Sequence, residues 1–141
     1  MAMSPRARVT IGLAVLAVAC GAGPRPGDPG YAYNVSGVYA GRLFVGNDWF
    51  DARLELRTAP GGRVQGVFRV GAPFRIDGRV TGAVMDDLLR LTVPYAGTAA
   101  RACDGRIEGI LTVERGGGVI DGPVTITDCE GALAGRMSFR R

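Results

Sequence analysis

The side chains that most often carry out chemistry in proteins are scarce in this sequence. Its 141 residues include no histidine, and its cysteines are Cys20, Cys103 and Cys129. Without histidine, a serine or cysteine nucleophile lacks its usual base, and the thiols alone offer too few ligands for a typical zinc site. We therefore expect no catalytic residue, no metal and no cofactor, and a protein that is not an enzyme.

The cysteines indicate structure rather than reactivity. Cys20 ends an apolar N-terminal segment, which leaves Cys103 and Cys129 as an even pair. Neither belongs to a CxxC sequence or has a neighbouring histidine that would lower the pKa of its thiol. In an oxidising compartment, such a pair forms a disulfide. We expect a structural disulfide between Cys103 and Cys129.

Five acidic residues are expected to lie close to Arg101 at one end of the barrel. The acidic ones near Arg101 are Asp48, Asp51, Asp104, Asp128 and Glu130. They suggest either a calcium site or ordinary solvated carboxylates, and we expect the second. The paired Asp86 and Asp87 are typical of a turn. All 17 basic residues are arginine, and a net charge of +4, spread along the chain, does not indicate a nucleic-acid partner.

A Gly-x-apolar-x-Gly phrase recurs along the chain. The copies are GVYAG at 37–41, GRVQG at 62–66, GRVTG at 78–82, GRIEG at 105–109, GVIDG at 118–122 and GALAG at 131–135. A phosphate-binding loop would open a helix, and a helix–helix seam would lie in a long apolar span. None of the copies meets either condition, so both interpretations are excluded.

The phrase instead belongs to alternating strands. In GRIEGILTVE, Ile107, Gly109 and Leu111 share one face, and Arg106 and Glu108 share the other. This period of two is that of a half-buried strand. A glycine on the inward face gives up packing, and it is favoured where a strand bends or where the space is tight, as in a small closed barrel.

The spacing of these segments predicts an eight-stranded antiparallel up-and-down β-barrel over residues 36–141, because tight turns separate the strands. The expected strands are 37–46, 50–58, 62–71, 73–84, 87–95, 103–114, 118–127 and 131–140. The side chains expected inside are apolar: Tyr39, Leu43, Leu54, Leu56, Val64, Phe68, Phe74, Ile76, Leu89, Leu91, Ile107, Leu111, Ile120, Ile126, Leu133, Met137 and Phe139. Such a barrel is wide enough to be filled by side chains or to hold one small ligand.

The meander places the longest loop, 96–102, at the end of the barrel away from the N-terminal segment. We expect a binding site at this distal rim, formed by Asp48, Trp49, Tyr95 and Arg101, although Trp49 points outward by the alternation. Two functions stay open. The barrel is a binding module for a small apolar ligand or lipid, with a cavity behind Trp49 and Tyr95, or it is a compact interaction protein with a filled core.

The N-terminal segment has the layout of a signal peptide. Arg6 and Arg8 precede the apolar run 9–19, which is too short to span a bilayer. LAVAC at 16–20 resembles the lipobox of bacterial lipoproteins, with Ala17 where that family usually has leucine. The resemblance implies cleavage after residue 19, acylation of Cys20 and a membrane anchor. Glycine at 21 implies an outer-membrane address in the cell envelope, with the periplasmic or surface side left open.

Residues 20–35 are rich in glycine and proline, and we expect a flexible tether there. The domain 36–141 resembles the calycin barrels, which include lipocalins and avidins. The resemblance rests on the glycine-bent strands and on SGVY at 36–39, with Tyr39 in place of the usual tryptophan. The polar biotin contacts of the avidins have no counterpart here. Partners are therefore expected to be the membrane and either an apolar ligand or an envelope protein.

Overall fold

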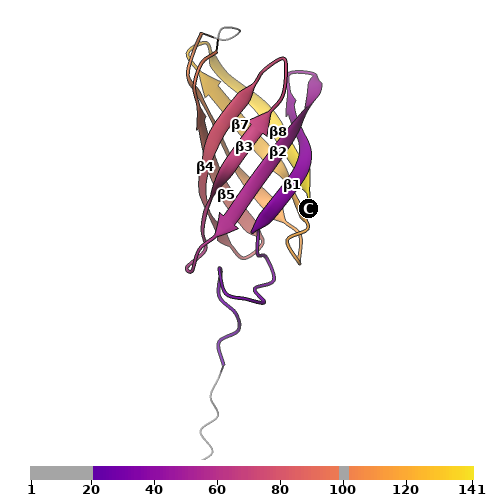
Figure 1. Ribbon diagram of the computed structural model, residues 1–141, viewed down its shortest axis with the longest axis vertical. Coiled ribbons are helices and arrows are strands. Elements are labelled where there is room, and N and C mark those ends of the chain that lie inside the picture. Colours follow the sequence, from indigo (N-terminus) through magenta and orange to yellow (C-terminus); the bar gives the residue numbers. More distant parts are fainter. Residues whose placement is uncertain (1–20, 99–101) are drawn as a thin grey trace, which may run out of the picture.

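Antiparallel strands make up most of the chain. The computed structural model describes residues 21–98 and 102–141. The strands are β1 (Gly37–Val45), β2 (Asp48–Thr58), β3 (Arg63–Val70), β4 (Ile76–Met85), β5 (Leu88–Tyr95), β6 (Gly105–Val113), β7 (Val119–Asp128) and β8 (Gly131–Arg140). They pair in sequence order, and β8 pairs with β1 to close the barrel (Figure 1). The predicted fold class is confirmed.

The period of two places the apolar side chains in the barrel. Along β4, Ile76 and Val80 are buried, whereas Asp77 and Arg79 on the opposite face are exposed. Within the described residues, every buried side chain of the core is hydrophobic. Apolar burial of this kind is the main favourable contribution to folding. In the centre of the barrel, Phe68 packs edge-on against Phe139, with ring centroids 6.1 Å apart.

The inward glycines lie where neighbouring strands approach closely. A Cβ atom at Gly66 would collide with the carbonyl oxygen of Glu55, and one at Gly41 would collide with that of Ser138. At Gly109, the nearest atom to an added Cβ is the carbonyl oxygen of Pro123, at 2.6 Å. The repeated glycines therefore serve the geometry of the sheet, as the alternation predicted.

One strand extends beyond its neighbour. The pairing of β1 with β8 ends at Val45 and Gly135, whereas β8 continues to Gly131 against β7. Residues 131–134 therefore have a strand on one side only, and a notch opens in the wall. Leu133, predicted to lie in the core, is 57% exposed. That prediction was wrong because alternation fixes the direction of a side chain but not where the adjacent strand stops.

The N-terminal segment closes the opposite end, which we call the proximal end (Figure 1). Val35 is fully buried, and Tyr31 and Tyr33 pack against the core. The backbone N–H of Gly116 donates to the Ala32 carbonyl oxygen at 2.6 Å. Tyr31, Tyr33 and Val35, which lie in the expected tether, therefore pack against the open end of the barrel. The expected domain boundaries at 19/20 and 35/36 stay predictions.

Arg141 joins the C-terminal strand to this closure. Its guanidinium donates to the carbonyl oxygens of Ser36, at 2.5 Å, and Gly116, at 2.8 Å. The same group lies over the ring of Tyr39, 5.6 Å from the centroid. The Tyr39 hydroxyl donates to the Gly117 carbonyl oxygen at 2.7 Å. The proximal end is therefore held by hydrogen bonds as well as by apolar packing.

Candidate functional site

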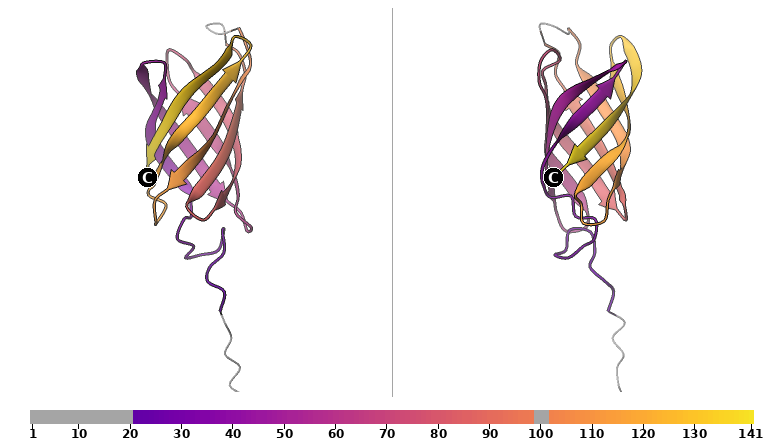
Figure 2. Two further views of the ribbon diagram at one scale, coloured as in Figure 1. Left: turned by 180° about the vertical axis from the view of Figure 1, so that it is seen from behind. Right: turned by 90° about the vertical axis from the view of Figure 1, so that its right-hand side faces the viewer.

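The distal end of the barrel is formed by the turns β1–β2, β3–β4 and β7–β8 together with the connection between β5 and β6. The β1–β2 and β7–β8 hairpins diverge there, and their tips stand apart in the left view of Figure 2. The register agrees with this separation, because residues 131–134 of β8 pair with β7 and have no partner in β1. The sequence predicted which connections share this end, but it did not indicate the notch.

Trp49 lies on the outer wall near this end. It is 44% exposed and packs against Phe44 across the β1–β2 pair, with ring centroids 5.1 Å apart. The Arg42 guanidinium stacks over the indole, 5.2 Å from its centroid. Such a cation–π contact stabilises an exposed pair modestly. Trp49 therefore points outward, as the alternation predicted, and it does not line the interior.

The structure does not bring Trp49 and Tyr95, two of the predicted rim residues, together. Tyr95 points into the barrel from β5 and is 4% exposed, with its ring over Gly105, where a side chain would collide with it. Trp49 is on the outer face of β2, and Asp48 is exposed at the start of that strand. Arg101 lies outside the described residues. Trp49 and Tyr95 therefore lie on opposite faces of the barrel wall, and the rim site stays a prediction.

The acidic side chains near this end support turns. Asp104 accepts a hydrogen bond from the backbone N–H of Gly97, and Asp128 accepts one from that of Glu130, each at 2.8 Å. Such bonds are typical of aspartate in turns. Within residues 21–98 and 102–141, no three acidic or thiol side chains come together in a group that could hold a metal ion.

The mouth of the barrel at the distal end carries apolar side chains that are only partly covered. Phe50 and Phe74 pack edge-to-face with ring centroids 4.5 Å apart, and both are half-buried. Val45 is half-buried next to them at the end of β1. Phe50 lies on the same face of β2 as the inward Leu54. The alternation therefore predicts an inward direction for Phe50, but the sequence analysis did not include this residue.

A pocket lies beside the notch, on the β7–β8 hairpin. Its volume is about 220 Å³. It is lined by Ile126, Asp128, Glu130, Gly131, Ala132 and Leu133. The inward face of the hairpin thus presents an exposed leucine beside two carboxylates. A surface of this kind suits an apolar group, because contact with Leu133 and Ile126 removes apolar area from water.

The disulfide lies at the same end. Cys103 is bonded to Cys129, which joins the residues before β6 to the β7–β8 turn. The register pairs Gly105 with Asp128, so the disulfide extends the β6–β7 ladder beyond its last pair. The predicted pairing is confirmed. It restrains the turn of the hairpin that carries the pocket.

The predicted signal peptide, residues 1–19, and the predicted lipidation site, Cys20, lie outside the described residues. In the part of the chain that the structure describes, no helix has the length and apolar character needed to cross a membrane.

Comparison with known proteins supports the fold alone. No protein-family model and no curated protein matches the sequence. Among solved structures, the chain is similar to a redesigned beta barrel, mFAP1, bound to DFHBI, with a TM-score of 0.56 and 12% sequence identity. The match covers 76% of this chain and 94% of that one. The chain therefore shares an eight-stranded barrel architecture with a structure that holds a small molecule.

Proposed function

We propose that this protein is a ligand-binding barrel that takes a small apolar molecule at its distal mouth, without catalysis. The observation that carries the proposal is Leu133, an inward-facing leucine that is 57% exposed beside a pocket of about 220 Å³. Apolar side chains exposed in a concave surface are typical of ligand-binding sites. The half-buried Phe50 and Phe74 add partly exposed apolar side chains at the same end of the barrel.

The filled core limits the size of a ligand that can bind at the distal mouth. Phe68, Phe139 and Tyr39 are fully buried, so a ligand rests on the core rather than passing through it. A volume of about 220 Å³ suits a small ring system or part of a chain. The similar barrel bound to DFHBI supports a small molecule as the class of ligand.

The test is a titration with a neutral apolar fluorophore, N-phenyl-1-naphthylamine. We expect enhanced emission with the native protein, and affinity about tenfold weaker for Leu133→Asp, since a charge at the pocket must be desolvated. Ile110→Asp is the matched control, because Ile110 is 48% exposed but lies on the outer wall of β6. Equal affinity of the two variants would refute the site.

A second function is favoured by the same filled centre. A barrel with a packed core also suits an interaction protein whose distal loops contact another envelope protein. If the fluorophore does not bind and a partner co-purifies with the native protein but not with Leu133→Asp, this second function replaces the first.

We also infer that Cys20 is acylated and anchors the barrel in the cell envelope at the outer membrane. The support is the run 9–19 followed by a cysteine, together with the N-terminal segment, drawn in indigo, which leaves the barrel at the end away from the mouth (Figure 1). Intact-mass analysis of the protein from its own cells tests this. We expect diacylglycerol and acyl masses on residue 20, and their absence from Cys20→Ser together with loss from the membrane fraction. An unmodified Cys20 would exclude the anchor.

A further inference from the structure

The edge of β8 beside the notch presents backbone groups that no neighbouring strand uses. Arg141 donates its backbone N–H to the Gly118 carbonyl oxygen, on the side of β7, at 2.9 Å. Because backbone groups alternate in direction along a regular antiparallel strand, the N–H and C=O of Leu133 also point to β7. Those of Ala132 point the other way. The ladder with β1 ends at Gly135, so Ala132 has no partner strand on that side within the described residues.

This edge lacks the features that usually protect a free strand edge. Natural edges avoid pairing with other chains through charged side chains, proline or a bulge. Residues 131–134 read Gly-Ala-Leu-Ala, and their pairing with β7 is regular. All four are exposed, so no element in the described part of the chain covers them. The edge is therefore open to one further strand, which would lie about 4.8 Å from β8.

A strand added at this edge would also cover apolar side chains. In an antiparallel pair, residues opposite each other point to the same face of the sheet. A residue opposite Leu133 would therefore point into the barrel mouth, where Leu133 is 57% exposed and Val45 is half-buried. Nothing lies within 4 Å of a Cβ atom at Gly131, so the same face has open space beside the turn. The edge thus suits a strand with an apolar residue at every second position.

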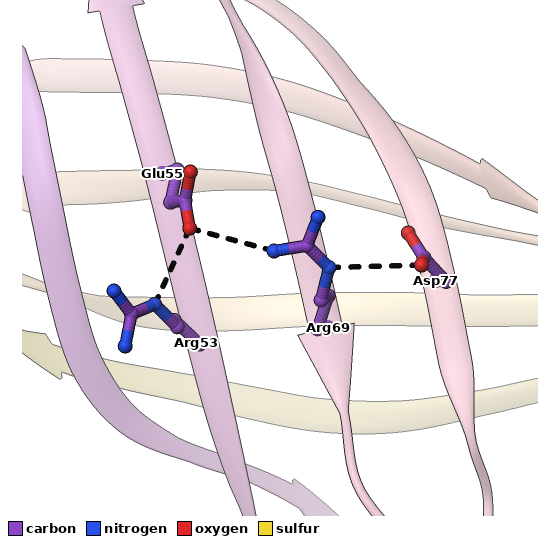
Figure 3. A network of polar contacts seen from close by, with 4 residues as sticks. All are labelled: Arg53, Glu55, Arg69 and Asp77. Atoms are coloured by element: carbon purple, nitrogen blue, oxygen red, sulfur yellow. Dashed lines mark hydrogen bonds and ion pairs between the residues drawn. The ribbon is translucent and has the colours of Figure 1, made fainter.

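The carboxylates beside the notch differ from those on the outer wall in their partners. On the wall, Glu55 and Asp77 share the guanidinium of Arg69, at 3.4 Å and 3.6 Å (Figure 3). Asp128 and Glu130 form no ion pair within residues 21–98 and 102–141. Their charge favours a basic partner, because complementary potentials favour association. A second copy of this chain would instead bring the same carboxylates together.

We propose that the free edge of β8 binds an extended segment of a partner protein as an added antiparallel strand, with alternate apolar residues toward the mouth and basic residues beside Glu130. The ladders on both sides of β8 are antiparallel, and in this direction the C-terminal part of the segment reaches the β7–β8 turn. Backbone hydrogen bonds supply affinity, and alternate side chains supply specificity. The proposal rests on the second function above, an interaction at the distal end, and does not require a small apolar ligand.

The experiment is isothermal titration calorimetry of the full chain with the peptide acetyl-Thr-Val-Thr-Val-Arg-Arg-amide, which we expect the native protein to bind. In the proposed register, the threonine N–H groups face β8 and the valine side chains face the mouth. N-methylation of both threonines should therefore weaken binding by about tenfold or more, whereas N-methylation of both valines should change it by less than about twofold. Replacement of both arginines by glutamate should weaken binding by about tenfold, because like charges then meet at Glu130.

Ala132→Pro tests the edge from the side of the protein. It removes the N–H that points to the open edge and leaves the ladder with β7 intact, and proline is tolerated at such edge positions. We expect peptide affinity to fall about tenfold, while N-phenyl-1-naphthylamine still binds because Leu133 is unchanged. Ala132→Ser is the matched control, since it keeps the N–H and should bind like the native protein. Urea unfolding checks that both variants are folded, and amide exchange at Ala132 should slow when the peptide binds.

Further outcomes separate the alternatives. No binding of the unmodified peptide, equal binding of the two N-methylated peptides, or unchanged binding by Ala132→Pro would overturn strand addition. If a partner co-purifies with Ala132→Pro but not with Leu133→Asp, the interaction function stands and strand addition fails. If the native protein is a dimer that the peptide does not dissociate, and Ala132→Pro is a monomer, the edge binds a second copy and the proposal fails. Peptide binding without fluorophore binding would reject the small-molecule function and support this proposal.

Discussion

At the scale of single residues, the inward glycines and Tyr39 affect the packing of the barrel in two different ways. Gly66 allows β2 and β3 to approach, because its missing Cβ leaves room for the Glu55 carbonyl oxygen. Tyr39 fills the proximal part of the core and donates its one hydroxyl hydrogen to Gly117. Gly66 acts because it has no side chain, and Tyr39 acts through a hydrogen-bonded hydroxyl group. A substitution at each position tests its role.

Gly66→Ala should lower the free energy of unfolding by about 1–3 kcal/mol, because a methyl group there forces backbone displacement. Gly71→Ala is the matched control, since nothing lies within 4 Å of a Cβ atom at that position. It should change stability by less than about 0.5 kcal/mol. Urea unfolding of the three proteins measures both values. Equal stability of the two variants would show that the glycine is not required at position 66.

Ionisation of Tyr39 should make the free energy of unfolding depend on pH in the alkaline range. Burial raises the pKa of its phenol above the usual value of 10.0, and Arg141 partly opposes this shift. A group whose pKa is raised by folding contributes stability that is present below its unfolded pKa and lost as pH rises through its folded pKa. Stability should therefore decline above pH 10.0, the ordinary tyrosine pKa. Burial also raises the pKa of Tyr31, which acts in the same direction.

Tyr39→Phe should remove part of this alkaline loss. At neutral pH it should cost about 1 kcal/mol, because the Gly117 carbonyl oxygen loses its buried donor. Between pH 9 and pH 11 its unfolding free energy should fall less than that of the native protein. Urea unfolding at these pH values measures the difference. Parallel declines of the two proteins would assign the alkaline loss to other groups.

At the scale of strands, the alternation in the sequence predicted most of what is observed. Each strand was predicted at close to its observed bounds, because period two persists over many residues and turn residues separate the strands. The direction of Trp49 and the pairing of Cys103 with Cys129 follow from the same argument, since both depend only on parity and on which ends of strands meet.

The features that sequence analysis missed depend on relations between strands. The notch arises because β8 extends beyond the end of β1. No residue in β8 indicates where β1 ends. The packing of Tyr31 and Tyr33 on the core was not predicted, because the glycine and proline residues around them indicated a flexible tether. Relations of this kind are set by the closed barrel and not by local pattern.

The disulfide between Cys103 and Cys129 acts at this scale, because it ties β6 to the β7–β8 turn across a sequence separation of 26. Reduction should lower the free energy of unfolding by about 3–4 kcal/mol. Denaturation with and without dithiothreitol measures this effect, with Cys103→Ser/Cys129→Ser as the variant insensitive to reductant. Amides near residues 128–131 should exchange faster in that variant. Unchanged stability after verified reduction would contradict this role.

At the scale of the whole molecule, the two ends of the barrel differ. The distal end is open, with partly exposed apolar side chains, whereas the proximal end is covered by residues 31–36 and joined to the C-terminal strand through Arg141. The proposed site for an apolar ligand lies at the open end.

Arg141→Ala tests the covered end, because it removes the donors to Ser36 and Gly116. We expect a loss of about 1 kcal/mol in unfolding free energy and faster amide exchange in residues 31–36, since the bonds are at an exposed surface. Arg140→Ala is the control, because Arg140 is the exposed neighbour on β8. Hydrogen–deuterium exchange measures the local effect. Identical exchange in both variants would mean that apolar packing alone holds the segment.

The contacts of residues 26–36 also determine how the molecule responds to mechanical load. A pull on the N-terminal segment first reaches the bond between the Pro26 carbonyl oxygen and Gly61, then the one between Ala32 and Gly116, and then the contact of Ser36 with Arg141. These bonds are loaded one after another, whereas the ladder between β1 and β8 spans many pairs and is reached last. Under such a load, we expect the segment to extend before tension reaches the barrel and its mouth.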